Sequence, residues 1–126
     1  MKIFLNSLSI GFLLCIISFT CCGQEQIAIS FDGIPISYRV HGNGSPALIF
    51  IHGWSCDQSY WDKQVPYFAR KYKVVKIDLV GHGDSGLGRK NWTIIAFAED
   101  VAAVVNKLDL DQCVLVGHSM GGPVIL

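Results

Sequence analysis

The sequence predicts an α/β fold in which a mostly parallel sheet carries helices on both faces. Three compact apolar runs, each bounded by Gly, Pro or Asp, are the main evidence: residues 47–51 (ALIFI), 74–77 (VVKI) and 113–116 (CVLV). Continuous runs of this length are typical of strands buried on both faces of a parallel sheet. Because segments with helical spacing lie between them, we expect strands joined by helical crossovers.

Two further strands are expected ahead of these runs. Residues 27–31 and 36–40 flank the turn 32–35, and apolar and polar side chains alternate along the second of them. This pattern predicts a hairpin at one edge of the sheet.

Two segments have apolar residues at helical spacing. Residues 59–71 can place Trp61, Val65, Phe68 and Ala69 on one face, and residues 93–108 show a longer apolar stripe that includes Phe97. We therefore predict one helix over each segment. The expected order is three strands, a helix, a strand, a helix and a strand, followed by the start of another helix.

Composition narrows the classes of function. The chain has 126 residues, of which 51% are hydrophobic and 16% charged, so it is not of the disordered class. Ten basic and ten acidic residues give a formal net charge of zero. Binding of a phosphate backbone usually requires an excess of basic residues, which this chain lacks. We therefore expect no nucleic-acid partner.

The N-terminus has the layout of a secretory signal peptide. Lys2 precedes an apolar stretch at 10–19 and a run of small residues at 20–23, and no charged residue occurs between Lys2 and Glu25. We expect residues 1–23 to be a signal peptide or lipoprotein signal and residues 24–126 to form the domain. The alternative is an uncleaved anchor, because the uncharged stretch is long enough to cross a bilayer as a helix.

Residues 19–22 (FTCC) resemble a loose form of the bacterial lipoprotein box, which makes Cys22 a candidate lipid anchor. The expected location is therefore outside the cytoplasm, as a periplasmic, secreted or membrane-tethered protein, with membrane contact only through this lipid or an uncleaved anchor. Only Cys56 and Cys113 lie in the domain, which is no disulfide framework. Cys113 opens an apolar run and is expected to be a small buried hydrophobe.

The strongest motif is G-H-S-M-G-G at residues 117–122, directly after a predicted strand. A serine in a G-x-S-x-G turn between strand and helix has its Oγ exposed above the sheet, and the glycines occupy positions where the backbone is crowded. Pro123 suits the first turn of the helix that follows.

A second motif, His52-Gly53-Trp54, follows the run at 47–51. A glycine turn at the carboxyl end of a strand lets a backbone N–H point into the crevice where open α/β folds bind ligands. Acyl transfer needs two such donors for the developing oxyanion. A third motif, D-L-V-G-H-G-D-S-G at 78–86, follows the run at 74–77.

With these three motifs in this order, the chain resembles the N-terminal half of an α/β-hydrolase-fold enzyme. The resemblance implies that Ser119 is the nucleophile and that the backbone N–H groups of Trp54 and Met120 form the oxyanion hole. It implies a small-molecule acyl substrate, an acyl-enzyme resolved by water and no cofactor. The resemblance also gives supporting roles to His52 and Gly53, in the turn after residues 47–51, and to Gly117, His118 and Gly121, in the strand-to-helix turn around Ser119 (the nucleophile elbow). The residues of the third motif are expected to be structural.

The sequence departs from the family in one respect. Family members carry the triad in the order Ser, Asp or Glu, then His, whereas all four histidines here precede Ser119. We therefore expect a fold incomplete at the C-terminus, in which Ser119 lacks a base. The main hypothesis is an esterase-like serine hydrolase, inactive as the chain stands. The alternative is a truncated non-catalytic fragment or binding scaffold.

Two other readings find less support. Residues 81–86 also satisfy G-x-G-x-x-G, but a dinucleotide site needs these glycines to open a helix, and 87–92 (LGRKNW) reads as loop. No histidine, cysteine or acidic pair has zinc-type spacing, so no metal site is predicted. A serine nucleophile also disfavours the dehalogenase and epoxide hydrolase chemistry of family members that use aspartate.

Overall fold

The computed structural model describes residues 23–126, so the predicted lipid anchor Cys22 and nearly all of the predicted signal segment lie outside the described residues. The described chain forms one sheet of strand order β1-β2-β4-β3-β5. β2 is antiparallel to β1 and β4, whereas β3 is parallel to β4 and β5, so the sheet is mostly parallel as predicted. The strands are β1 (Glu25–Ile29), β2 (Pro35–His41), β3 (Ala47–Ile51), β4 (Lys73–Ile77) and β5 (Cys113–Gly117).

The register of the parallel strands brings their carboxyl ends to one edge of the sheet. Ile51 of β3 pairs with Ile77 of β4 on one side and with Gly117 of β5 on the other. The segments that follow these three residues are the three sequence motifs. The fold therefore brings to one edge of the sheet three motifs that are separated by up to 66 positions in the sequence.

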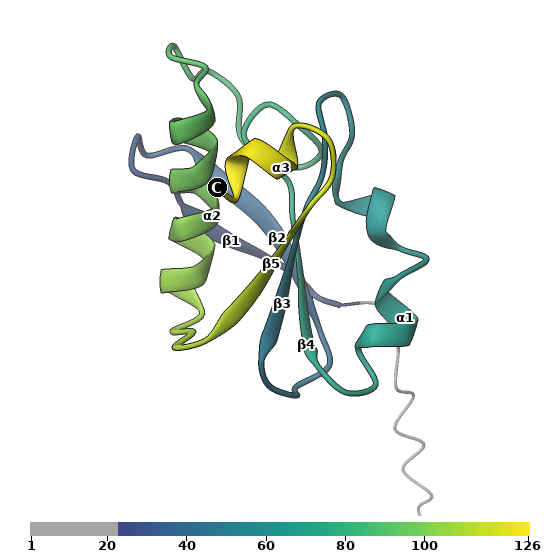
Figure 1. Cartoon of the computed structure of the whole chain (residues 1–126). Coiled ribbons are helices and arrows are strands. Elements are labelled where there is room, and N and C mark those ends of the chain that lie inside the picture. The colour runs from purple at the N-terminus through teal and green to yellow at the C-terminus, as the bar shows by residue number, and fades with distance from the viewer. Residues whose placement is uncertain (1–22) are drawn as a thin grey trace, which may run out of the picture.

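Helices cover both faces of the sheet, as predicted (Figure 1). On one face α2 (Ile94–Lys107) and α3 (Gly121–Val124) pack on a cluster that includes Ile49, Ile77 and Val104. On the other face the 3-10 helix η1 (Gln58–Trp61) and α1 (Val65–Phe68) pack on Phe50 and its neighbours. Burial of these apolar side chains on two faces is the main stabilising contribution.

The prediction of one helix over 59–71 is wrong. The structure has two short pieces, η1 and α1, separated by a turn. Pro66 lies in the first turn of α1. Because proline has no backbone N–H and its ring clashes with the preceding turn, a helix cannot continue through this position. By contrast, the helix predicted at 93–108 is confirmed as α2, and the Thr93 hydroxyl accepts from the Ala96 N–H at 3.1 Å to cap it.

The edge hairpin is confirmed, but its first strand lies two residues earlier than predicted. Ser30 donates its N–H to Ile34 O at 2.9 Å, and Gly33 donates to Ser30 O at 2.9 Å. These bonds draw Ser30 and Phe31 into the turn, so β1 ends at Ile29. The bounds of the second strand, where apolar and polar residues alternate, were predicted more accurately than those of the first.

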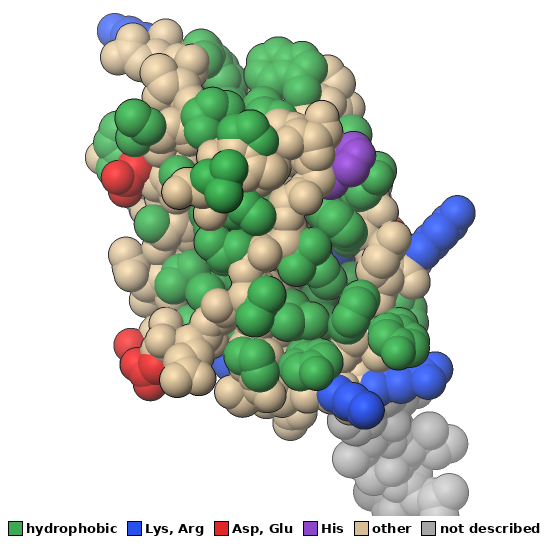
Figure 2. Space-filling model, viewed as in Figure 1, with side chains coloured by type: hydrophobic (Ala, Val, Ile, Leu, Met, Phe, Trp, Pro, Cys, Tyr) green, Lys and Arg blue, Asp and Glu red, His purple; other side chains and the backbone are tan. Residues whose placement is uncertain are grey.

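β5 lies at an edge of the sheet and is only partly covered. Every residue of β3 is buried, whereas none of β5 is, and Val114 is exposed. Figure 2 shows hydrophobic side chains gathered over the face where β5 and α3 lie. Cys113 is accordingly half-buried, not buried as predicted, and both Cys56 and Cys113 are free thiols. Within residues 23–126, no helix has the length and apolar character to cross a bilayer.

Candidate active site

Ser119 lies in a sharp turn between β5 and α3 with a φ of 52°, a left-handed conformation that is costly for a residue with a side chain. The turn closes through two bonds, from the Gly121 N–H to His118 O at 2.8 Å and from the Gly122 N–H to Ser119 O at 2.9 Å. A Cβ atom on Gly117 would clash with the backbone carbonyl of Gly121. The turn is therefore as tight as the motif predicts, and the side chain of Ser119 is exposed.

The same turn is pressed against the end of β3. The His118 N–H donates to Ile51 O at 3.0 Å, and a Cβ atom on Gly121 would lie 2.5 Å from that carbonyl oxygen. A Cβ atom on Gly53 would lie 3.0 Å from the Cβ of Ser119. The glycines thus allow the turn after β3 and the turn after β5 to touch, and two of the three predicted motifs meet at Ser119.

Two backbone donors beside Ser119 are unused. Among the hydrogen bonds of residues 23–126, none has the backbone N–H of Trp54 or of Met120 as donor. Each residue belongs to one of the two touching turns, next to Gly53 and Ser119 respectively. Two N–H groups free of a protein acceptor are what an oxyanion requires.

His52 is a buried structural residue of the first turn. Its Nε2 accepts from the Leu79 N–H at 3.1 Å, so Nδ1 must carry the proton and donates to Gly53 O at 2.7 Å. Burial lowers the pKa of His52, and the nearby imidazole of His82 acts in the same direction. With both nitrogens engaged, His52 is not placed to take a proton from Ser119.

His82 and His118 contact other groups, although Nδ1 of His118 has no hydrogen-bond partner among residues 23–126. The Nδ1 of His82 donates to Val80 O at 3.0 Å, and the ring of His118 stacks on Tyr60 at 4.3 Å. His41 pairs with Val74 near the amino end of β4, at the other end of the sheet. In the part of the chain that the structure describes, no hydrogen bond joins the Ser119 hydroxyl to His52, His82 or His118.

Asp78, in the third motif, holds two loops together. Its buried carboxylate accepts from the backbone N–H of Gln58 at 2.6 Å, from the Gln58 side chain at 2.8 Å and from the Asp84 N–H at 3.1 Å. Its backbone carbonyl accepts from Ser85 Oγ at 2.6 Å. Gly83 passes so close to the carboxylate that a Cβ atom would overlap it. These contacts are structural, in line with the role that the resemblance implies.

The sequence analysis missed a buried ionic cluster behind this loop. Arg89, read as part of a loop, donates to both carboxylate oxygens of Asp100 at 2.9 and 2.6 Å and to Asp32 at 2.8 Å. Its Nη1 also donates to the carbonyl of Ala96, and Ser30 completes the cluster. Hydrogen bonds from Arg89 lower the pKa of Asp32, and the two carboxylates raise that of Arg89 against the effect of burial. No local pattern links residues so far apart in sequence.

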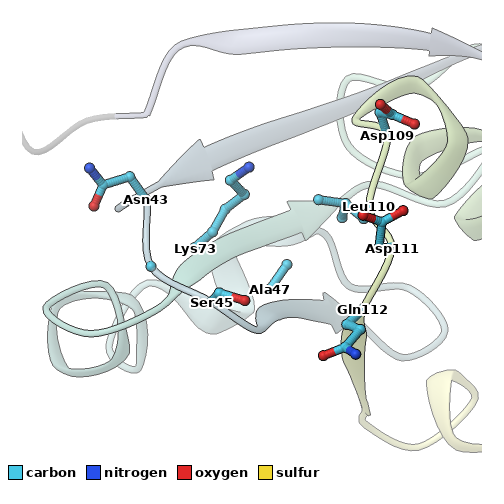
Figure 3. Close-up of a pocket in the computed structure, with 9 residues that line it drawn as sticks. Asn43, Ser45, Ala47, Lys73, Asp109, Leu110, Asp111 and Gln112 are labelled. Carbon is cyan, nitrogen blue, oxygen red and sulfur yellow. The ribbon is translucent and has the colours of Figure 1, made fainter.

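The alternative sites find no structural support. The loop 81–86 is followed by irregular chain, and the next helix begins only at Ile94, so its glycines do not open a helix. Residues 23–126 contain no group of three His, Cys, Asp or Glu side chains placed to hold a metal. A cavity of about 350 Å³ lies at the opposite end of the sheet, near the start of β4, and Figure 3 shows Lys73 on one side of it and Asp109 and Asp111 on the other.

A serine on a strained strand-to-helix turn, at the carboxyl edge of a mostly parallel sheet and against a glycine turn, defines an α/β-hydrolase-type site. The comparison with protein families agrees. Residues 46–126 match the family model described as alpha/beta hydrolase fold, and the chain belongs to this family.

Curated relatives and solved structures are similar over most of this chain. It is 38% identical to a strigolactone esterase of Pisum sativum, over 70% of this chain and 36% of the relative. It is 39% identical to a bifunctional esterase/perhydrolase of Acinetobacter calcoaceticus, over 72% of this chain and 34% of the relative. The crystal structure of an esterase from a Rhodococcus species superposes with a TM-score of 0.75 at 36% identity, over 80% of this chain and 38% of that one. The chain thus spans about a third of the length of these relatives.

Proposed function

We propose that this chain is the N-terminal part of a serine hydrolase that acts on ester-like acyl substrates. The observation that carries the proposal is the placement of Ser119. It is exposed at a φ of 52° and in contact with the His52-Gly53-Trp54 turn, beside two backbone N–H groups with no acceptor among residues 23–126. The esterase names of two relatives and of one solved structure support ester-like substrates.

In the proposed reaction, Ser119 Oγ attacks the carbonyl carbon of the substrate and the carbonyl oxygen becomes an oxyanion. The N–H groups of Trp54 and Met120 stabilise this oxyanion, each by about 3 kcal/mol. The alcohol leaves with the electron pair of the broken C–O bond and takes up a proton, which leaves an acyl-enzyme. Water then attacks the acyl carbon and releases the acid and the free serine.

The proton of Ser119 must pass to a base during attack. His52 is excluded by its hydrogen bonds, and family members place the triad histidine after the serine in the chain. We infer that the acid and the histidine of this hydrolase follow the same order.

A fluorophosphonate probe tests the role of Ser119, because it reacts covalently with activated serines. In the full-length protein, which would include the triad acid and histidine, we expect labelling of the wild type and none of Ser119→Ala. Ser59→Ala, which removes an exposed hydroxyl in η1, is the matched control and should label like the wild type. Equal labelling of wild type and Ser119→Ala would overturn the assignment. A wild type that takes up no probe would favour a non-catalytic scaffold.

We further propose that the protein is exported and that Cys22 carries the lipid. The uncharged stretch after Lys2 and the FTCC sequence support this proposal. Mass spectrometry of the processed N-terminus should find a lipid-modified Cys22 as the first residue. An unmodified chain that begins at Gln24 would contradict the lipid anchor and leave simple secretion.

A further inference from the structure

The ring of Tyr60 lies nearly flat against the imidazole of His118, the residue directly before Ser119. The two ring centroids are 4.3 Å apart and the ring planes differ by 21°. Tyr60 belongs to η1, which follows the Trp54 turn, and His118 belongs to the turn between β5 and α3. A side chain of η1 therefore bears directly on the strand-to-helix turn that carries Ser119.

Among residues 23–126, no hydrogen bond orients the imidazole of His118. Its Nδ1 is buried and has no partner, whereas in His52 and His82 a ring nitrogen is bonded to a backbone group. The orientation of the His118 ring therefore depends on packing. Tyr60 supplies the ring face on which it stacks.

The His118 ring also borders the turn after β3. A Cβ atom on Gly53 would lie 3.1 Å from Nδ1 of His118 and 3.0 Å from the Cβ of Ser119. The residue after Gly53 is Trp54 and the residue after Ser119 is Met120, whose backbone N–H groups are the two unused donors. A shift of the His118 ring would therefore change the gap between the two turns, and with it the spacing of the two donors.

Tyr60 packs on a buried base. Its ring meets that of Trp61 at 5.1 Å and 87°, and the ring of Trp61 stacks on Phe50 of β3 at 4.9 Å. Trp61 and Phe50 belong to the core on this face of the sheet, whereas Tyr60 is 44% exposed. The stack on His118 is thus the outer end of a series of ring contacts that begins in the central strand of the site.

The loop of the third motif supports the same contact. The carboxylate of Asp78 accepts from the backbone N–H of Gln58 at 2.6 Å, and Gln58 opens η1 two residues before Tyr60. Asp78 therefore helps to set the position from which Tyr60 reaches His118.

We propose that Tyr60 is a positioning residue of this hydrolase. Its ring holds the imidazole of His118, and His118 in turn fixes the left-handed backbone of Ser119 and the spacing of the two oxyanion donors. A φ of 52° at a residue with a side chain persists only where surrounding contacts enforce it. The inference rests on the proposed hydrolase function, and it gives Tyr60 no contact with the substrate.

Steady-state hydrolysis of p-nitrophenyl acetate by the full-length protein tests the role of the ring. Tyr60→Phe keeps the ring and removes the hydroxyl, whereas Tyr60→Leu removes the ring. We expect Tyr60→Leu to lower kcat about tenfold and to leave KM within about twofold of wild type, because a misplaced nucleophile slows the reaction more than it weakens binding. Tyr60→Phe should keep kcat within about twofold of wild type.

Tyr67→Leu is the matched control, because Tyr67 is an exposed tyrosine of α1 whose ring contacts Phe68 of the same helix. It should change neither kcat nor KM. An unchanged kcat in Tyr60→Leu would overturn the proposal. An equal loss in Tyr60→Phe would do so as well, since the hydroxyl would then be the active group. A change confined to KM would make Tyr60 a substrate contact instead.

A double-mutant cycle separates this role from a general loss of stability. His118→Leu removes the other ring of the stack, so it should lower kcat to a similar extent, and the double variant with Tyr60→Leu should lose no more than either single variant. Strictly additive losses would contradict the proposal. Circular dichroism shows that each variant is folded.

NMR follows the contact without requiring reaction. In Ser119→Ala, the imidazole protons of His118 should carry a ring-current shift that Tyr60→Phe retains and Tyr60→Leu removes. A shift that is absent from the parent would overturn the proposal. A wild type that neither labels with the phosphonate nor hydrolyses the ester would refute the hydrolase function and the positioning role together. A reactive wild type whose kcat is insensitive to loss of the Tyr60 ring would refute the positioning role alone.

Discussion

His52 accepts a hydrogen bond from the backbone N–H of Leu79 at 3.1 Å, and this bond joins the turn after β3 to the segment after β4. The other ring nitrogen donates to Gly53 O. Only the neutral imidazole can make both bonds, since a protonated ring has no acceptor nitrogen. The position of the Trp54 turn therefore depends on the charge of His52.

A pH dependence of stability follows from this arrangement. Burial lowers the pKa of His52 below its ordinary value of 6.5, so the unfolded chain binds a proton more readily than the folded one. The stabilisation is fully present above pH 6.5 and is lost as the pH falls through the lower pKa of the folded state. Urea unfolding at pH 8 and pH 5 should show a larger loss for wild type than for His52→Asn. Equal losses in the two proteins would contradict this role.

Substitution by alanine should have very different effects at two glycines of the turn around Ser119, Gly117 and Gly122. In Gly117→Ala the new Cβ meets the backbone of Gly121, whereas in Gly122→Ala it meets nothing within 4 Å. We expect Gly117→Ala to lower the free energy of unfolding by about 1–3 kcal/mol and to reduce phosphonate labelling. Gly122→Ala should keep both near wild type. A similar loss in both variants would show that the backbone of the turn adapts.

The left-handed conformation of Ser119 predicts an order of stability between two variants. At a φ of 52° glycine is unstrained and alanine is not, so Ser119→Gly should be about 1 kcal/mol more stable than Ser119→Ala. At Ser59, in η1, the order should reverse, because helical backbone favours alanine. Denaturant unfolding of the four variants measures both differences. Alanine more stable than glycine at 119 would contradict the strained turn.

Replacing one member of the Arg89–Asp100 pair should destabilise the fold, and replacing both should cost less stability than the two single changes added together. Both side chains are almost fully buried, so Asp100→Asn removes the buried carboxylate that faces Arg89, leaves the guanidinium paired only with the partly exposed Asp32, and should destabilise the chain by about 3–5 kcal/mol. Arg89→Leu alone leaves the opposite charge. The double variant Arg89→Leu/Asp100→Leu should lose less than the sum of the single changes. Strict additivity in the double-mutant cycle would indicate that the pair is not coupled.

Features with a local signal were predictable. β3 and β5 are continuous apolar runs, and α2 repeats its apolar stripe over several turns, so each lies within two residues of its predicted range. The tight turn at Ser119 was predictable because its glycines and the serine lie within six consecutive residues. The prediction over 59–71 failed because apolar spacing was weighted above Pro66, whose effect on a helix is also local.

Features built from distant residues were not predictable. The Ser30–Asp100 bond joins residues 70 positions apart, and neither side chain carries a pattern that points to the other. The bond between His52 and Leu79 likewise appears only once β3 and β4 are adjacent. The ring contacts of Trp54 with His82, of His82 with Phe97 and of Phe97 with Trp92 likewise join distant segments, and the sequence analysis singled out only Trp54 among them for a place near the site.

The strand order also sets the sequence of events as the chain leaves the ribosome. β1 and β2 can pair as soon as residue 41 is free, because they are neighbours in both chain and sheet. β3 has no partner at that stage, since β2 and β3 are separated in the sheet by β4, which is made more than 20 residues later. The hydrophobic strand β3 therefore stays unpaired until β4 has been synthesised. During this interval a nascent chain of this topology is most exposed to chaperones and to aggregation.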